Sequence, residues 1–272
     1  MTDKPFQAFD DWREASRINL QQGVRPEYAG LTGGLFSIAE PQETDPSPIM
    51  IPKEFLSLAR TVSCHSDPER WALLYAALWR FKEGEGYLLK LTADPLMQRL
   101  LTMEKAVRRD AHKTKAFVRF QSVQDEEGEH FIAWHQSDHD VLPLVAPFFR
   151  RRFEVMRWTI LSPLRSVTWD GEDLIFHEGV PEAQAPDNED AMEGLWRAYY
   201  RATFNPARIK LKMMRREMPV RYWTTMPETV LIPDMINEAP ARVAAMIAHQ
   251  QEMDARDKIK NRTGKGDENG GR

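Results

Sequence analysis

Cysteine is nearly absent from this chain, since Cys64 is the only one among its 272 residues. A single cysteine excludes an internal disulfide framework and any zinc or iron–sulfur site built from several cysteines of this chain. The Cys-x-x-x-Cys-x-x-Cys spacing of a radical-SAM cluster is therefore missing as well. Such a composition is typical of a reducing compartment, and we expect a cytoplasmic protein.

Long apolar runs and glycine-rich phosphate loops are also missing. No stretch approaches the roughly 20 apolar residues of a membrane-spanning helix, and the N-terminus lacks the apolar core of a signal peptide. The sequence contains no Gly-x-Ser-x-Gly turn of the kind that carries a hydrolase nucleophile. We therefore expect no membrane partner and no cofactor, and no catalytic motif identifies the chain as an enzyme.

The net charge is small, because 41 acidic residues offset 37 basic ones to give −4 at pH 7. The charges are nevertheless segregated along the chain. Acidic residues gather at Asp10–Asp11, Glu40–Asp45, Asp125–Glu129 and Asp170–Glu193. The segment Arg197–Arg221 is rich in arginine and lysine and contains a single acid, Glu217. This segregation lets a nearly neutral protein present a basic surface to a polyanion.

A cationic stripe lies on a predicted helix that begins at Asp94-Pro95, where Asp suits the cap and Pro the first turn. At helical spacing, Leu100, Met103 and Val107 would face inward and the basic side chains outward. The candidate nucleic-acid-binding residues of this stripe are Lys105, Arg108, Arg109, His112, Lys113, Lys115 and Arg119. We predict that they contact phosphates, whereas a merely solvated helix face is the alternative for any single charge.

Two further basic clusters would strengthen such binding if they shared a face with the stripe. Their candidate residues are Arg151 and Arg152 in one cluster, and Arg208, Lys212 and Arg215 in the other. Aromatic side chains near the predicted sheet could in addition stack on unpaired bases, although aromatics at strand spacing more often belong to a core. These aromatic candidates are Phe117, Trp134, Trp158 and Trp169.

Histidine spacing does not favour a metal site. His130 and His135 are five residues apart in a predicted strand, so their side chains should point to opposite faces. His139, beside Asp138 and Asp140, is more typical of a helix cap than of a metal ligand. We therefore predict no metal.

A hydrolase hypothesis has only scattered candidates. Cys64 beside His65 is more typical of a buried structural thiol than of a nucleophile, since adjacent residues seldom place a base against one. A hydrolase would need His112 or His65 beside a carboxylate such as Asp110 or Asp67. A concave pocket joining these residues would favour that hypothesis.

Local patterns predict an α+β fold, with a mostly antiparallel sheet of about five short strands and helices before and after it in the sequence. The predicted strands are Ala116–Val123, His130–Gln136, Arg157–Leu161, Arg165–Trp169 and Asp173–His177, with a hairpin at Asp170-Gly171. The predicted helices are Phe9–Val24, one from Pro52, one from Asp67 to Gly84, the cationic helix, Val141–Phe153, Asp187–Phe204, and Pro227 to about Met253. We divide the chain into an N-terminal helix with an acidic linker (1–48), one α+β domain (49–253) and a disordered charged tail (254–272).

Several longer motifs carry a family resemblance. They are His65-Ser-Asp-Pro-Glu-Arg-Trp-Ala-Leu-Leu-Tyr75, Lys105–Phe120, Ala146-Pro-Phe-Phe-Arg-Arg-Arg-Phe153, Trp169-Asp-Gly171, Leu195-Trp-Arg-Ala-Tyr-Tyr200 and Phe204-Asn-Pro-Ala-Arg208. In these motifs the chain resembles a bacterial family assigned to DNA repair or DNA metabolism. The resemblance covers roughly Phe55 to Met246.

In that family the domain either stands beside a radical-SAM protein linked to DNA repair or is fused ahead of an X-type uracil-DNA glycosylase. The resemblance implies DNA and one of these enzymes as partners. It transfers no catalytic residue, and this chain has no glycosylase active-site motif. We therefore predict an accessory DNA-binding protein that presents damaged or modified DNA to the partner enzyme. A DNA-processing hydrolase and a protein–protein scaffold without DNA contact are the alternatives.

Overall fold

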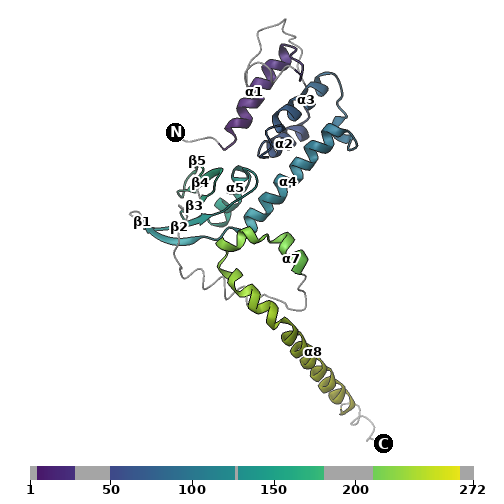
Figure 1. Cartoon of the computed structure of the whole chain (residues 1–272), viewed down its shortest axis with the longest axis vertical. Helices are drawn as coiled ribbons and strands as arrows, with labels where there is room; N and C mark the ends of the chain where they lie inside the picture. Colours follow the sequence, from purple (N-terminus) through teal and green to yellow (C-terminus); the bar gives the residue numbers. More distant parts are fainter. Residues whose placement is uncertain (1–4, 28–49, 126–127, 181–210, 264–272) are drawn as a thin grey trace, which may run out of the picture. The chain divides into compact units, whose positions relative to one another are not determined.

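The computed structural model describes residues 5–27, 50–125, 128–180 and 211–263 of the chain (Figure 1). The chain divides into two compact units, Met1–Asn188 and Glu189–Arg272. The first unit contains the sheet and the cationic helix, and the second contains the C-terminal helices. None of the described helices is both long enough and apolar enough to cross a membrane.

The first unit begins with helices that match the sequence prediction. They are α1 (Gln7–Gln21), α2 (Lys53–Val62), α3 (Arg70–Lys82) and α4 (Pro95–Phe117), with a 3-10 turn η1 (Leu88–Lys90) before α4. Apolar side chains at helical spacing bury one face of each helix, and Trp12, Phe55, Leu74 and Leu100 are almost fully inaccessible to solvent. These residues form one continuous apolar cluster across the four helices.

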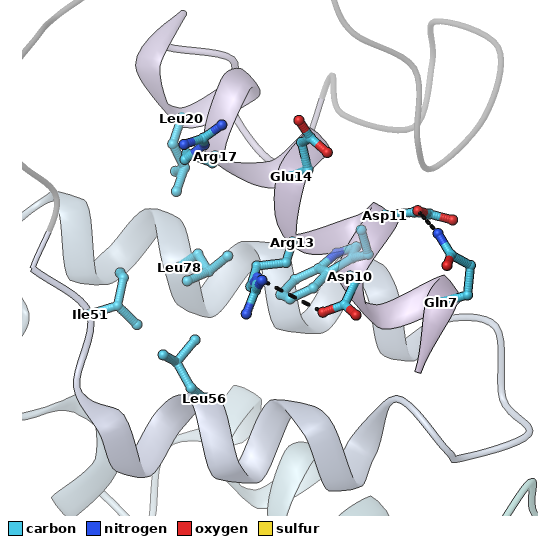
Figure 2. A pocket seen from close by; sticks show the side chains of 11 residues that line it. Gln7, Asp10, Asp11, Arg13, Glu14, Arg17, Leu20, Ile51, Leu56 and Leu78 are labelled. Atoms are coloured by element: carbon cyan, nitrogen blue, oxygen red, sulfur yellow. Dashed lines mark hydrogen bonds and ion pairs between the residues drawn. The ribbon is translucent and has the colours of Figure 1, made fainter. Parts of the chain in front are cut away.

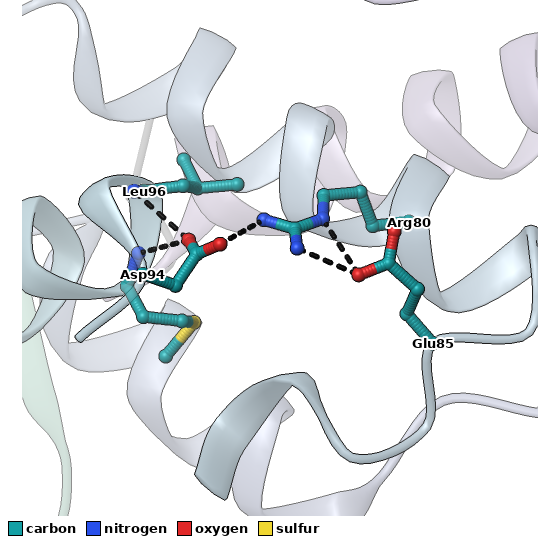
Figure 3. Close-up of polar contacts among 5 residues, drawn as sticks. Arg80, Glu85, Asp94 and Leu96 are labelled. Atoms are coloured by element: carbon teal, nitrogen blue, oxygen red, sulfur yellow. Dashed lines mark hydrogen bonds and ion pairs between the residues drawn. The ribbon is translucent and has the colours of Figure 1, made fainter. Parts of the chain in front are cut away.

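The start of α4 is fixed by a polar clasp (Figure 3). One oxygen of Asp94 accepts the backbone N–H groups of Leu96 and Met97 at 3.0 and 3.1 Å, as predicted for a helix cap. Its other oxygen accepts Nη1 of Arg80 on α3 at 2.7 Å, and Arg80 also donates twice to Glu85. Because Arg80 pairs with it, the pKa of Asp94 is lowered. The clasp thereby ties the first turn of α4 to α3.

A mixed sheet of five strands follows α4. The strands are β1 (Gln121–Asp125), β2 (Gly128–Trp134), β3 (Trp158–Leu161), β4 (Arg165–Trp169) and β5 (Leu174–Glu178), and they lie in the order β1-β2-β3-β4-β5. Only β2 and β3 pair in parallel, and α5 (Leu142–Arg152) makes the crossover that a parallel pair requires. The predicted α+β fold with a mostly antiparallel sheet is confirmed.

One predicted element boundary differs from the structure, and one predicted turn is confirmed. The cationic helix continues to Phe117, so the first strand begins at Gln121 and not at Ala116. No glycine or proline interrupts this stretch, and buried Thr114 bonds back to the carbonyl of Asp110, which is compatible with helix. The predicted turn at Asp170-Gly171 is confirmed, since Gly171 has a φ of +106° and Asp170 accepts two backbone N–H groups of the loop.

The sheet packs against α5 and the second half of α4. Trp158, Ile160, Val167 and Phe176 from the strands join Phe149 of α5 in a second apolar cluster. The helix α4 contributes Leu100 and Met103 to the first cluster and Val107 and Ala111 to the second. It therefore runs from the helical layer to the sheet, as Figure 1 shows, and holds the two halves of the first unit together.

The second unit is described from Leu211 onward. It consists of α7 (Leu211–Glu217), the 3-10 turns η4 (Val220–Thr225) and η5 (Pro227–Leu231), and the long helix α8 (Ile232–Thr263). Helix α8 extends to Thr263, past the predicted end at about Met253. The predicted helix Asp187–Phe204 lies outside the described residues.

Candidate nucleic-acid interface

The two sides of α4 differ in composition. Met103, Val107, Asp110, Ala111 and Thr114 are buried. The predicted cationic residues Lys105, Arg108, Arg109, His112 and Lys115 are exposed, and Lys113 is half-exposed. At 100° per residue, the centre of this cationic set lies opposite the centre of the buried set. The prediction that the cations share the outward face of one helix is confirmed, whereas their contact with DNA stays a prediction.

Arg108, a member of the stripe, bonds closely to an acid on the same helix. Its Nε and Nη2 atoms donate to one carboxylate oxygen of Glu104 at 2.8 and 2.6 Å. Glu104 lies at i−4 on the edge of the outward face, a spacing typical of a stabilising surface pair. Its charge offsets that of Arg108, so Glu104 competes with an external phosphate for this guanidinium.

The C-terminal ends of α4 and α5 lie side by side. Nζ of Lys115 lies 5.5 Å from the centre of the Phe148 ring, and Phe120 contacts Phe149 with ring centres 5.9 Å apart. The predicted residues Arg151 and Arg152 are exposed in the last turn of α5. Both helices therefore bring cations to one region, where these cations also offset the negative ends of the two helix dipoles.

Arg119 has a structural role in addition to its charge. Its Nη1 atom donates to the carbonyls of Ala116 and Val118 at 2.7 and 3.1 Å. These carbonyls lie at the C-terminal end of α4, where backbone acceptors lack helical partners. The half-exposed guanidinium therefore caps the helix, which makes Arg119 a weaker phosphate candidate than Lys105 or Arg109.

The third predicted basic cluster belongs to the second unit. Lys212 and Arg215 are exposed on α7, and Arg208 lies outside the described residues. Their suggested contact with nucleic acid stays a prediction.

Base stacking by the three tryptophans is not possible in this structure. Trp134, Trp158 and Trp169 are all buried, with at most 7% of each side chain exposed. Trp158 and Trp169 belong to the apolar cluster between the sheet and α5. Phe117 is half-exposed at the end of α4. The core interpretation of the tryptophans is therefore confirmed, and the exposed cations are left as the main candidates for contact.

The hydrolase candidates separate into two groups. His112 is exposed on the outward face of α4, away from buried Asp110. His65 stacks on His139 with ring centres 4.2 Å apart, and the carboxylate of Asp110 accepts the backbone N–H of His139 at 2.9 Å. His139 thus links His65 to Asp110. No local sequence pattern indicates this arrangement, because the Ser66–His139 contact joins residues that are 73 positions apart.

Four backbone N–H groups of the loop around His65 donate hydrogen bonds to other groups of the protein. The N–H groups of Ser66 and Asp67 donate to Nδ1 of His139 and Nδ1 of His65, at 3.2 and 3.1 Å. The N–H groups of Glu69 and Arg70 donate to the side chain and the carbonyl of Asp67. None of these four amides is available to stabilise an oxyanion, which argues against hydrolysis at this loop.

Cys64 is a structural thiol, as predicted. Its side chain is 5% exposed, and burial, followed by the nearby charge of Asp140, raises its pKa to about 12. A thiol with such a pKa is not a nucleophile near neutral pH. Among the described residues, no group of three or more His, Cys, Asp or Glu side chains is arranged to hold a metal ion.

Two hollows lie beside α1, far in sequence from these candidates. One, of about 580 Å³, has an apolar floor that includes Ile51, Leu56 and Leu78 and a rim that includes the Arg13–Asp10 ion pair (Figure 2). The other, of about 560 Å³, is lined by Phe6, Phe9 and neighbouring residues. Neither of these two hollows is lined by a predicted site residue, so neither joins His65 or His112 to a carboxylate.

The first unit is thus an α+β fold in which the cations of α4 lie on the outward face of the helix. The chain belongs to the family of the DUF4130 domain, a domain of unknown function, whose model matches residues 68–228. This match spans more than half of the chain and includes α3, α4, the sheet and α5. No curated protein and no solved structure matches the chain.

Proposed function

We propose that the protein binds the phosphate backbone of DNA through the outward face of α4 and the adjoining end of α5. The observation that supports this proposal is the placement of Lys105, Arg109 and Lys113 on the side of α4 opposite its buried residues. Lysine and arginine side chains contact phosphates without reading the base sequence. The cations at the end of α5 extend the same surface beyond Lys115.

This binding would be independent of base sequence. The tryptophans that were candidates for base stacking are buried, so affinity would come chiefly from charge. Charge-driven binding releases counterions and weakens steeply as salt increases. The proposal therefore predicts a strong salt dependence and similar affinity for unrelated sequences of equal length.

We further propose that this binding serves an accessory role in DNA repair in the cytoplasm of a bacterial cell. The support is the resemblance to repair-linked proteins, which suggests a radical-SAM repair protein or a uracil-DNA glycosylase as the partner that receives the DNA. The second unit offers a possible docking element, because Met246, Ile247 and Met253 of α8 are each about half exposed. A scaffold without DNA contact is therefore the second candidate function.

The test is a DNA-binding titration with the full chain and its charge-reversal variant Lys105→Glu/Arg109→Glu/Lys113→Glu. Labelled single-stranded and double-stranded oligonucleotides, with and without uracil, would be titrated across a salt series by fluorescence anisotropy. We expect the wild-type protein to bind, and the variant to lose affinity and about 3 units of salt slope, roughly one per phosphate contact. Thermal unfolding of the variant should stay within a few degrees of wild type.

The matched control reverses three exposed cations elsewhere on the first unit, as Arg17→Glu/Lys53→Glu/Lys90→Glu. Its net charge changes by the same amount, so a general charge effect would weaken both variants equally. Equal losses would contradict the proposed surface. No binding by the wild type at any salt concentration would instead leave the scaffold as the favoured function, to be tested with purified partner enzymes.

A further inference from the structure

Two loops that are far apart in the sequence meet at a pair of stacked imidazole rings. One loop joins α2 to α3 and carries His65, and the other joins β2 to α5 and carries His139. The two rings are inclined by 30° with their centres 4.2 Å apart. Beside them, the N–H of Asp140 donates to the carbonyl of Cys64 at 3.0 Å. The contact therefore joins the helical layer to the sheet layer beside the inward side of α4, where Asp110 accepts the N–H of His139.

The two backbone hydrogen bonds to the rings require both imidazoles to be neutral. Nδ1 of His139 accepts the N–H of Ser66 at 3.2 Å and lies 3.1 Å from the hydroxyl of the same serine, and Nδ1 of His65 accepts the N–H of Asp67 at 3.1 Å. A backbone N–H can only donate, so each Nδ1 must present a lone pair and carry no proton. An imidazolium carries a proton on both nitrogens, so it can accept neither bond in either ring orientation.

We propose that His65 and His139 form an acid-sensitive latch, which holds the α2–α3 loop against the β2–α5 loop and opens when either ring is protonated. Protonation of either ring would set its Nδ1–H against a backbone N–H and would place a positive charge against the second ring. At His139, only the hydroxyl of Ser66 would remain as an acceptor for the protonated Nδ1. This inference does not depend on DNA binding.

The sign of the pH dependence follows from the environment of His65. Burial lowers its pKa, and the neighbouring His139 lowers it further. Because the folded protein favours the neutral ring, the contribution to stability is fully present above the ordinary histidine pKa of about 6.5. It is lost as the pH falls through the lowered pKa of the folded state.

Charged groups face the pair from each element packed around it. They are Asp67 and Arg70 at the start of α3, Arg99 and Asp110 on α4, Asp140 before α5, and Arg165 on β4. The pKa of Asp67 is lowered, chiefly by the N–H of Glu69, so Asp67 stays ionised in the range where histidine titrates. Burial raises the pKa of Asp140, and its protonation on acidification would stabilise the fold. Titration of Asp140 would therefore stabilise the folded loops in acid, so it does not account for an opening of the loops there.

The test is amide hydrogen exchange of the full chain, at about one pH unit above and one below the ordinary histidine pKa of about 6.5. Exchange rates are corrected for the intrinsic effect of pH and read at the amides of Ser66, Asp67 and Asp140. We expect protection at these amides to fall about tenfold or more in acid, while amides in α3 and β4 keep their protection. Unchanged protection at Ser66 and Asp67 would overturn the proposal.

The matched control is the double variant His65→Asn/His139→Asn. The Oδ1 atom of asparagine can accept the same N–H groups as Nδ1, but the side chain does not titrate in this range. Protection in this variant should be insensitive to pH, and a persisting loss in acid would assign the effect to another group and refute the latch. If the double variant does not fold, His139→Asn alone should remove the pH dependence at Ser66, and failure to do so would equally refute it.

Discussion

The outward face of α4 and the loop contact at His139 both gather charged and titratable side chains, but they use them differently. On α4, Lys105 and Arg109 are exposed to solvent, and the apolar residues of the same helix lie on its other side. At the loop contact, Nδ1 of His139 accepts a backbone N–H from the other loop, and Nδ1 of His65 accepts one from its own loop. The first arrangement exposes cations that an external polyanion can contact, and the second uses its polar groups in hydrogen bonds within the fold.

This difference separates function from stability along a single helix. Asp110 faces inward and supports the His139 loop, while Arg109, the next residue toward the N-terminus, faces outward. Substitutions on the inward side should therefore reduce stability, and substitutions on the outward side should reduce DNA binding without reducing stability. Each prediction below tests one side of this division.

The largest effect on stability is expected from the inward residue Leu100. Its side chain is fully buried in the helical cluster, so Leu100→Ala should lower the free energy of unfolding by about 2–5 kcal/mol. Urea unfolding followed by tryptophan fluorescence measures this loss. On the outward side of the same helix, Lys105→Ala should change stability by less than about 0.5 kcal/mol. A comparable loss in both variants would contradict the division of α4 into two faces.

A smaller loss is expected at Asp110. Asp110→Ala removes the carboxylate that accepts the backbone N–H of His139 and leaves this donor without that partner inside the protein. The expected cost is about 1–3 kcal/mol in urea unfolding. Asp110→Asn keeps an acceptor oxygen at this position and should recover much of the loss. If the two variants are equally destabilised, the negative charge of Asp110 matters more than its hydrogen bond.

The parts that sequence patterns predicted are local ones. The cap at Asp94, the turn at Gly171 and the outward cations of α4 each depend on residues within a few positions of one another. The contact between Ser66 and His139 depends on how two layers pack, and no short pattern encodes it. The same reason explains the tryptophans, because strand spacing places Trp158 on a sheet face but does not say that α5 covers that face.

Arg119 tests the boundary between the two roles, since it was predicted to contact phosphate and also caps α4. Arg119→Ala removes the donor to the carbonyls of Ala116 and Val118 and should cost about 0.5–1.5 kcal/mol in unfolding. Its effect on DNA affinity should be smaller than that of Lys105→Ala, measured at the same salt concentration. A larger effect on binding than on stability would place Arg119 among the phosphate contacts.

The smallest effect is expected from Glu104, the acid at the edge of the cationic face. Glu104→Gln removes the negative charge that holds Arg108 at 2.6 Å, and the guanidinium would then be available to DNA. We expect the surface pair to have contributed only about 0.2–0.5 kcal/mol to stability, so unfolding should barely change. DNA affinity should increase at low salt, and the salt slope should steepen by about one unit, because one more phosphate would be neutralised. In the Glu104→Gln/Arg108→Gln double variant this gain should vanish. A gain that persists there would mean that Glu104 weakens binding through the field of the whole face and not through Arg108.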